Sequence, residues 1–243
     1  MTTIATIEAR MTSTRLPGKV LMPSQGQPML ALMVERLRFV PNLDGIVIAT
    51  TTNAADDCIE QLAVDLGVGC WRGSEDDVML RVLDAAKAFK ADVIVETTGD
   101  CPLIDPKLVE FCIQNYFNSG ADYLSNVLQR SFPIGMDTQV FSTKVLEDAA
   151  SRTSDPVDHE HVSLFIYRHP ELYKLANVMA PPNLHDPELR LTLDTQLDFQ
   201  LIDKIFGALL QNNPRFTLGD ILSLLAANPE WRKINDHVAH RYV

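Results

Sequence analysis

The sequence predicts a single α/β domain, built on a mostly parallel sheet with helices on both faces. Short apolar runs such as 45–51 (GIVIATT) and 91–100 (ADVIVETTGD) are typical of buried strands. Segments of helical length and pattern alternate with these runs, and that order is typical of a parallel sheet with helices on both sides. The chain has 243 residues, 46% of them hydrophobic, which is enough for one sizeable domain.

The elements follow in order along the chain. Strands are predicted at 2–9, 45–51, 68–73 and 91–100, and helices at 29–40, 54–66 and 76–90. The alternation then changes: 132–142 predicts a turn and a strand, 155–171 a capped helix, 189–206 a strand, a turn and a helix, and 217–228 a final helix that ends near Asn228–Pro229. We therefore predict one domain over 1–243, with an inserted arm at about 132–185.

Composition excludes several classes of function. The net charge is -11 and the pI about 4.9, so a general nucleic-acid surface, which needs a basic face, is not expected. The four cysteines lie far apart with no CxxC pair, which indicates reduced thiols and neither a disulfide framework nor a zinc site. No segment has the pattern of a signal peptide or of a membrane span, so we expect a soluble, cytoplasmic protein.

Three cations follow the first predicted strand, in the stretch EARMTSTRLPGKVL (8–21). Arg10, Arg15 and Lys19 are interleaved with small and hydroxyl residues, and Gly18 allows close approach of the backbone to a ligand. The stretch matches neither the P-loop nor the GxGxxG fingerprint. Because ligands of parallel sheets bind beyond the carboxyl ends of the strands, this loop is a candidate phosphate site. The alternative is a solvated loop with ordinary surface cations.

Two aspartates also follow apolar runs. Asp100 comes directly after the strand at 91–100, with Gly99 before it, and could hold Mg²⁺, although a turn or cap role would also explain it. Asp194 precedes a predicted helix, and N-capping alone would account for it. As a pair from two strand ends, they could share one metal. Asp105–Pro106 predicts a helix N-cap with proline at the first helical position.

The stretch WRGSEDDVMLR (71–81) predicts a turn before a helix. Ser74 or Glu75 is the expected N-cap, and acids early in that helix suit its macrodipole. Structural duty is the preferred interpretation of Glu75 and Asp76, whereas Ser74, Asp77 and Arg81 could face a ligand.

Two histidines stand two residues apart in DHEHVSLFIYRH (158–169). On a helix, His159 and His161 would not share a face, which argues against a metal site. We expect a structural role for His159, and a contact with an acceptor substrate or a neighbouring subunit for Glu160 and His161.

Several motifs together resemble one enzyme family. IEARMTSTRLPGKVL resembles the opening motif of the sugar cytidylyltransferases, which join CTP to acidic sugars such as 3-deoxy-manno-octulosonate. The stretches RGSEDDVMLRVLDAAK, TGDCPLIDP, FPIGMDTQVFS, DHEHVSLFIYRHPE and LRLTLDTQLDFQLI are most similar to the spore coat polysaccharide biosynthesis branch of that family. The resemblance spans about residues 4–225, in order.

The resemblance implies a Rossmann-like nucleotide-diphospho-sugar transferase (GT-A-like) sandwich, often dimeric, that uses CTP, Mg²⁺ and a sugar-type acceptor. It assigns the triphosphate to Arg10, Arg15 and Lys19, the metal to Asp100 and Asp194, the nucleotide to Thr50, Arg72, Gly73, Ser74 and Gly99, and the acceptor to Asp137, Gln139, Glu160 and His161. The implied function is transfer of CMP to an acidic sugar or a sugar or polyol phosphate, with release of pyrophosphate, for surface polysaccharide biosynthesis.

Two positions depart from the family pattern. Gln139 stands where many relatives have a carboxylate, and Glu96–Thr97 where a basic residue often precedes the TGDCP turn. Both departures bear on the identity of the acceptor. Two other classes remain: a glycosyltransferase of similar fold, although GDCPLID contains no Asp-x-Asp, and a non-catalytic nucleotide-binding protein.

Overall fold

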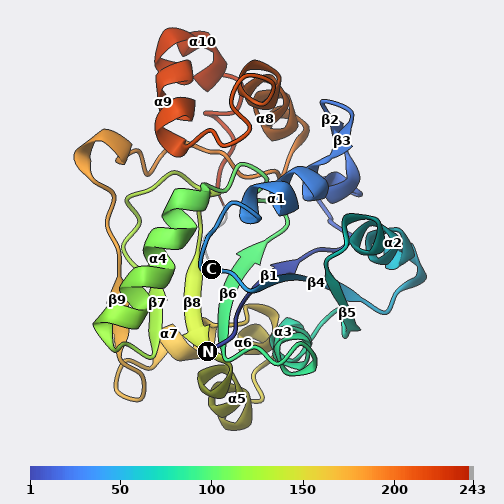
Figure 1. Cartoon of the computed structure of the whole chain (residues 1–243), viewed down its shortest axis with the longest axis vertical. Helices are drawn as coiled ribbons and strands as arrows, with labels where there is room; N and C mark the ends of the chain where they lie inside the picture. Colours follow the sequence, from blue (N-terminus) through green and yellow to red (C-terminus); the bar gives the residue numbers. More distant parts are fainter. Residues whose placement is uncertain (241–243) are drawn as a thin grey trace.

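The computed structural model describes residues 1–240 and is built around a seven-stranded sheet of order β5-β4-β1-β6-β8-β7-β9 (Figure 1). Every pairing is parallel except those of β8, which runs antiparallel to both of its neighbours. The prediction of a mostly parallel sheet is therefore confirmed. The strands are β1 (Thr3–Glu8), β4 (Gly45–Thr51), β5 (Gly69–Gly73), β6 (Val93–Thr98), β7 (Tyr123–Ser125), β8 (Gln139–Ser142) and β9 (Leu175–Asn177), and β2 (Pro23–Ser24) pairs with β3 (Gln27–Pro28) in a separate hairpin.

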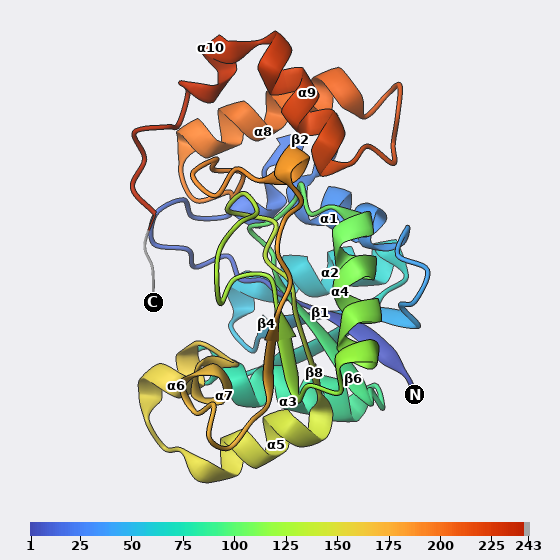
Figure 2. The same ribbon diagram turned by 90° about the vertical axis from the view of Figure 1, so that its left-hand side faces the viewer.

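Helices cover both faces of the sheet and one end of it. Figure 2 shows α8, α9 and α10 at one end of the molecule and α3, α5, α6 and α7 at the other, with the sheet between them. The helices are α1 (Met29–Leu37), α2 (Asp57–Leu66), α3 (Val78–Ala88), α4 (Pro106–Ser119), α5 (Thr143–Arg152), α6 (Pro156–Glu160), α7 (Leu164–Arg168), α8 (Gln196–Leu209), α9 (Leu218–Ala227) and α10 (Pro229–Arg232). Short 3₁₀ turns lie at η1 (Lys19–Leu21), η2 (Ala54–Asp56) and η3 (Pro182–Leu184).

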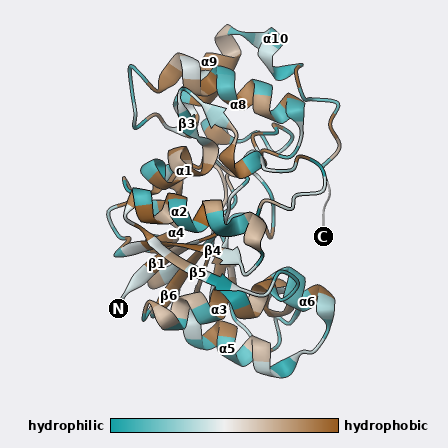
Figure 3. Cartoon of the chain, turned by 90° about the vertical axis from the view of Figure 1, so that its right-hand side faces the viewer, coloured by the Kyte–Doolittle hydropathy of each residue, from teal (hydrophilic) through white to brown (hydrophobic). Residues whose placement is uncertain are grey.

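The alternation of side chains along each strand creates two cores. In β1, Ala5 and Ile7 pack with α1, α2 and α4, whereas Ile4 faces α3, α5 and α7 on the other side. The covering helices are amphipathic, with teal and brown residues mixed along their length in Figure 3. Because both faces of the sheet are buried, the central strands are largely apolar, and this is the pattern that made them predictable.

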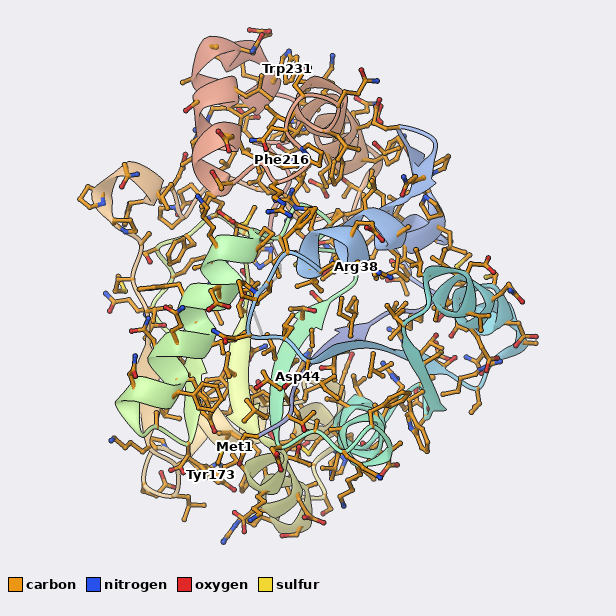
Figure 4. All side chains as sticks on the ribbon, in the orientation of Figure 1. Met1, Arg38, Asp44, Tyr173, Phe216 and Trp231 are labelled. Atoms are coloured by element: carbon orange, nitrogen blue, oxygen red, sulfur yellow. The ribbon has the colours of Figure 1, made fainter. Side chains whose placement is uncertain are left out.

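Buried Arg36 ties the C-terminal helices to α1. Its guanidinium lies 3.8 Å from the centre of the Phe216 ring and donates to the carbonyl oxygens of Ile104 at 2.8 Å and Phe216 at 2.9 Å. Figure 4 shows Phe216 and Trp231 within the C-terminal helical unit. After α10 the chain runs back toward the sheet (Figure 2). This return brings His240 next to Arg190.

Several local predictions need correction. The segment 132–185, expected as an inserted arm, supplies β8 to the interior of the sheet and α5–α7 to one face. The single helix expected over 155–171 is two short helices, interrupted at Val162, whose φ is 36°. The strand expected from 189 makes one isolated bridge, between Ile134 and Arg190.

Of two predicted helix caps, one is confirmed and the other is wrong. Asp105 caps α4 as predicted, accepting from the Lys107 amide at 2.8 Å, with Pro106 at the first helical position. The cap of α3 is Asp77 rather than Ser74 or Glu75, because the helix begins only at Val78.

Candidate active site

A cluster of cations and carboxylates lies beyond the end of β6. Lys19, on the 3₁₀ turn that follows the N-terminal loop, places its Nζ 3.0 Å from Oδ2 of Asp100 and 2.8 Å from Oδ1 of Asp194. Arg15 Nη2 lies 2.8 Å from the same Asp194 oxygen. Four of the predicted residues therefore converge on one site, although Lys19 and Asp194 are 175 positions apart in the chain.

Ion pairing has a larger effect than burial on the pKa values of Lys19 and Asp100 in this cluster. Burial alone would lower the pKa of Lys19, but the Asp100 and Asp194 carboxylates raise it above its ordinary value. Burial alone would likewise raise the pKa of Asp100, yet Lys19 and the Thr98 hydroxyl hold it below its ordinary value. Both groups of the Lys19–Asp100 pair are therefore charged at neutral pH, ready to interact with phosphate oxygens or a metal ion.

Asp194 is supported by Arg190 and Asp198, two residues that the sequence interpretation missed. Arg190 Nη2 lies 2.9 Å from Asp194 Oδ2, and Arg190 Nε lies 2.8 Å from Asp198 Oδ1, with all three side chains buried. The available signal was the alternation in LRLTLD, which places Arg190, Thr192 and Asp194 on the side opposite the buried leucines. Asp194 is not the helix cap, since Thr195 and Asp198 form a capping box at the start of α8.

Glu75 anchors the N-terminal loop to the neighbouring strand ends. It accepts hydrogen bonds from Thr12 Oγ1 at 2.5 Å and Asn53 Nδ2 at 2.5 Å, and it lies 3.2 Å from Arg10 Nη1. These contacts, led by the Thr12 hydroxyl, lower the pKa of Glu75. Glu75 thus has the structural role predicted for it. Arg10 is held apart from Lys19 and Arg15, with 41% of its side chain exposed and available to a ligand.

The residues assigned to the nucleotide lie at the ends of β4 and β5. Arg72 donates to the carbonyl oxygens of Thr51 and Asn53, each at 2.8 Å, and it pairs with Asp57 and Glu60 on α2. Its donors therefore bind these strand ends together, and its predicted contact with the nucleotide base stays a prediction.

The other nucleotide residues are tightly packed. Thr50 is fully buried, and its hydroxyl has no hydrogen-bond partner among residues 1–240. Ser74 Oγ accepts from the Asp77 amide at 3.1 Å beside Gly73, where an added Cβ would lie 3.0 Å from Arg81 Cγ. At Gly99, a Cβ would lie 2.9 Å from the Glu8 carbonyl oxygen, so close approach of β1 explains that glycine.

A pocket of about 570 Å³ adjoins the charged cluster and gathers all four residues assigned to the acceptor, Asp137, Gln139, Glu160 and His161. Thr98 connects the two regions, since it lines the pocket and donates to Asp100 Oδ1 at 2.5 Å. His240 provides a second connection, because it also lines the pocket and accepts from Arg190 at 3.2 Å.

Within the pocket, polar side chains form hydrogen bonds and ion pairs with one another. Arg130 donates to both carboxylate oxygens of Asp137, at 2.7 and 2.8 Å. The amide oxygen of Gln139 accepts from the hydroxyls of Ser163, at 2.6 Å, and Tyr123. The break between α6 and α7 brings Ser163 to this position.

His159 is engaged elsewhere. Its Nδ1 lies 2.8 Å from Asp77 Oδ1, and its Nε2 lies 3.1 Å from the Thr153 carbonyl oxygen. These contacts tie α6 to the start of α3, in agreement with the structural role predicted for His159. Asp77, considered as a ligand contact, serves this pair and caps α3.

The donor set suits a hard divalent cation. Asp100 and Asp194 both contact the Lys19 ammonium, so their oxygens already converge on one positive charge. Over residues 1–240 no group of three or more His, Cys, Asp or Glu side chains has metal-binding geometry. Two carboxylates completed by phosphate oxygens is an arrangement that Mg²⁺ accepts, whereas zinc prefers a fuller set of protein ligands.

A mainly parallel sheet that gathers two aspartates, Lys19 and Arg15 at the carboxyl ends of its strands, next to a pocket, has the layout of a nucleotidyltransferase. The family model described as cytidylyltransferase matches residues 4–220, and the chain belongs to this family. Transfer of a cytidylyl group is accordingly its reaction class, and the fold is the Rossmann-like sandwich of nucleotide-diphospho-sugar transferases.

Individual relatives agree with this membership. The spore coat polysaccharide biosynthesis protein SpsF of Bacillus subtilis (strain 168) is 35% identical over 92% of this chain and 94% of its own. A cytidylyltransferase structure from Leptospira borgpetersenii serovar Hardjo-bovis (strain JB197) is 33% identical, covers 100% of both chains and has a TM-score of 0.91. A CMP:2-keto-3-deoxy-manno-octonic acid synthetase solved with CTP shares the fold, with a TM-score of 0.63 at 17% identity over 85% of this chain and 99% of its own. Among the described residues no helix has the length and apolar character of a membrane span.

Proposed function

We propose that the protein transfers CMP from CTP to an acidic sugar or a sugar or polyol phosphate, releasing pyrophosphate, in the biosynthesis of a surface polysaccharide. The observation that carries this proposal is the Arg15–Lys19–Asp100–Asp194 cluster, joined through Thr98 to a pocket large enough for a sugar. The names of the relatives, a spore coat polysaccharide protein and a CTP-bound sugar-acid synthetase, support the substrate class.

The reaction needs positioning and charge neutralisation. An oxygen of the acceptor attacks the α-phosphorus of CTP, a new P–O bond forms, and the bond from the α-phosphorus to the bridging oxygen of pyrophosphate breaks. Arg10, Arg15 and Lys19 would balance the charge that grows on the β- and γ-phosphates, since Arg forms forked contacts with phosphate and Lys acts as a point charge.

Asp100 and Asp194 would hold a divalent metal, which we propose to be Mg²⁺. When bound, the metal would neutralise phosphate oxygens near the α-phosphorus. With the two aspartates engaged by a metal, the Lys19 ammonium would be available to the triphosphate. Arg190 keeps Asp194 oriented throughout, since it contacts the carboxylate oxygen that Lys19 does not contact.

The acceptor would occupy the pocket lined by Asp137, Gln139, Glu160 and His161. Thr98 lies between this pocket and Asp100, so an acceptor oxygen at the inner end would face the α-phosphate. We further propose that the protein acts in the cytoplasm as a homodimer, in agreement with the resemblance to the family.

The experiment is calorimetric titration of CTP, UTP, ATP and GTP into the purified protein, with and without Mg²⁺. Selective CTP binding that strengthens with Mg²⁺ in the wild type and weakens in Asp100→Asn is expected. Asp65→Asn is the matched control, because Asp65 is exposed on α2, where it accepts a hydrogen bond from Gln61. Selectivity for another nucleotide would contradict the cytidylyl assignment, and release of a nucleoside diphosphate in place of pyrophosphate would indicate a glycosyltransferase.

A further inference from the structure

Two glutamates that the mechanism does not use line the inner part of the acceptor pocket. Glu8 ends β1 and Glu96 lies in the neighbouring strand β6, and both side chains line the pocket. The charge of Glu8 adds to burial in raising the pKa of Glu96, so the two carboxyl groups do not both ionise readily at neutral pH. We call Glu8 and Glu96 the acid pair.

The acid pair makes no ion pair within residues 1–240. Glu96 is only 4% exposed. One oxygen of each, Glu8 Oε1 and Glu96 Oε2, is buried and has no hydrogen-bond donor in the described part of the chain. Arg81, whose charge lowers the pKa of Glu8, donates through Nη1 to the carbonyl oxygens of Ser74 and Glu75.

Burial raises the pKa values of both carboxyl groups of the acid pair. It raises the pKa of Glu8 to about 7, and it raises the pKa of Glu96 well above its ordinary value. A buried charge without a partner is costly, so a pair of this kind is kept where a ligand supplies the missing positive charge or donors.

The rest of the pocket does not compensate for the acid pair. Arg130, the one arginine among the described lining residues, pairs with Asp137, and Glu160 adds a further carboxylate. Burial, followed by the nearby Arg130 and Arg190, lowers the pKa of His240, so this histidine is neutral at physiological pH. The pocket is therefore acidic, while the adjoining cluster around Lys19 is the part that suits anions.

We propose that the acceptor is an amino sugar whose protonated amine binds against the acid pair of Glu8 and Glu96. This inference rests on the proposed function and specifies its acceptor. An ammonium provides three donors and a full positive charge, whereas a sugar hydroxyl provides one donor and no charge. This suits two carboxyl groups that make no ion pair and that each leave one oxygen without a donor within residues 1–240. A carboxylate of the acceptor would be repelled there, so any acidic group of the same sugar points away from the acid pair, toward the cations of the charged cluster.

The test compares matched acceptors in the presence of CTP and Mg²⁺. The probes are 2-, 3- and 4-amino hexoses and their 1-phosphates, each as the free amine, the N-acetyl form and the parent hydroxyl sugar, together with 3-deoxy-manno-octulosonate. Pyrophosphate release is the readout. For at least one position of the amine, kcat/KM is expected to exceed that of the matched N-acetyl and hydroxyl sugars by about tenfold or more, the usual effect of one charged hydrogen bond.

Variants assign the preference to the acid pair. Glu96→Gln and Glu8→Gln should remove most of the preference for the amine through a higher KM, while CTP affinity measured by calorimetry changes by less than about twofold because the cations remain. Glu147→Gln, a surface glutamate paired with Lys87, is the control that should retain the preference.

Three results would overturn the assignment: inert free amines in a protein that binds CTP, better use of an N-acetyl or carboxylate sugar, or an unchanged preference in both variants. Loss of CTP binding in the wild type would instead contradict the proposed function itself, so the two failures are distinguishable.

Discussion

Replacing Lys19 by Met tests the charged cluster most directly. The side chain of Lys19 is 11% exposed, and its Nζ lies 3.0 and 2.8 Å from two carboxylates, so methionine keeps the volume and removes only the charge. Asp194 would retain Arg15 and Arg190, but Asp100 would lose the one cation with which it pairs in the described chain.

The magnitude follows from that difference. Breaking a fully buried ion pair costs about 3–5 kcal/mol. The Asp100 side chain is 27% exposed, so water offsets part of the loss, and we expect about 1–3 kcal/mol of destabilisation. For a protein of this size that is a decrease of roughly 2–12 °C in Tm. The effect on turnover is larger, since losing one preorganised charge at the developing pyrophosphate typically costs about 10²–10³ in kcat.

The assay is pyrophosphate release at saturating CTP, with Tm measured on the same samples. Lys87→Met is the matched control, because Lys87 pairs with Glu147 at 2.6 Å with both side chains about half exposed. That change should cost less than about 1 kcal/mol and leave kcat unchanged. Normal turnover by Lys19→Met would refute the assignment of the triphosphate to this cluster, whereas equal losses in both variants would point to a general loss of folding.

Three further predictions concern the frame of the site. Arg190→Met should destabilise the fold by about 3–5 kcal/mol in urea titration, because two buried carboxylates lose their common partner, and a loss below about 1 kcal/mol would mean that they are solvated. Gly99→Ala should cost about 1–3 kcal/mol, since the new Cβ would lie 2.9 Å from a backbone oxygen of Glu8; unchanged stability would show that β1 can shift. The third prediction is a pH dependence: the pKa of Glu8, raised by burial from 4.5 to about 7, means that the folded state binds more protons, so stability falls as pH rises through that window. The double variant Glu8→Gln, Glu96→Gln should remove this decline in pH-dependent denaturation curves, and an equal decline in both proteins would assign it to other groups.

Local pattern was sufficient to predict the central strands and their helices. Strands β1, β4 and β6 are buried on both faces, so each is a largely apolar run that ends at polar residues, whereas the edge strand β5 is only half-buried. The segment from Phe132 onward was harder, because β8 enters the sheet antiparallel between two strands that run the other way. The position of β8 depends on its pairing with β6 and β7, and the sequence of a four-residue strand contains little information about its partners.

The helix break at Val162 has a tertiary cause of the same kind. Nothing in the local sequence stops a helix there, yet the left-handed backbone turns Ser163 toward Gln139. A polar contact between residues 24 positions apart is thus supported by a conformation that a valine rarely adopts. Local propensity predicts a continuous helix, and the requirement of the pocket overrides it.

For the site, position after a strand identified Lys19 and Asp100, since the carboxyl ends of parallel strands meet at one edge. Arg190 and Asp198 escaped notice because their importance lies in supporting Asp194, and a buried arginine is recognisable only when its carboxylate partners are known. Glu96 was noted as a departure from the family pattern. Its meaning emerges from the neighbouring β1, which brings Glu8 against it.

The division of charge within the site agrees with the acidic character of the whole chain. With a net charge of -11, the protein repels CTP at long range, but salt screens exposed charges beyond about 8 Å, so the local cations and a metal decide whether the triphosphate binds. An ammonium-bearing acceptor would experience the opposite field, attractive at long range and strongest at the acid pair. If the acceptor is an amino sugar, added salt should therefore weaken the binding of the amino sugar more than the binding of the matched, uncharged hydroxyl sugar. An equal salt dependence for the two sugars would argue against the ammonium.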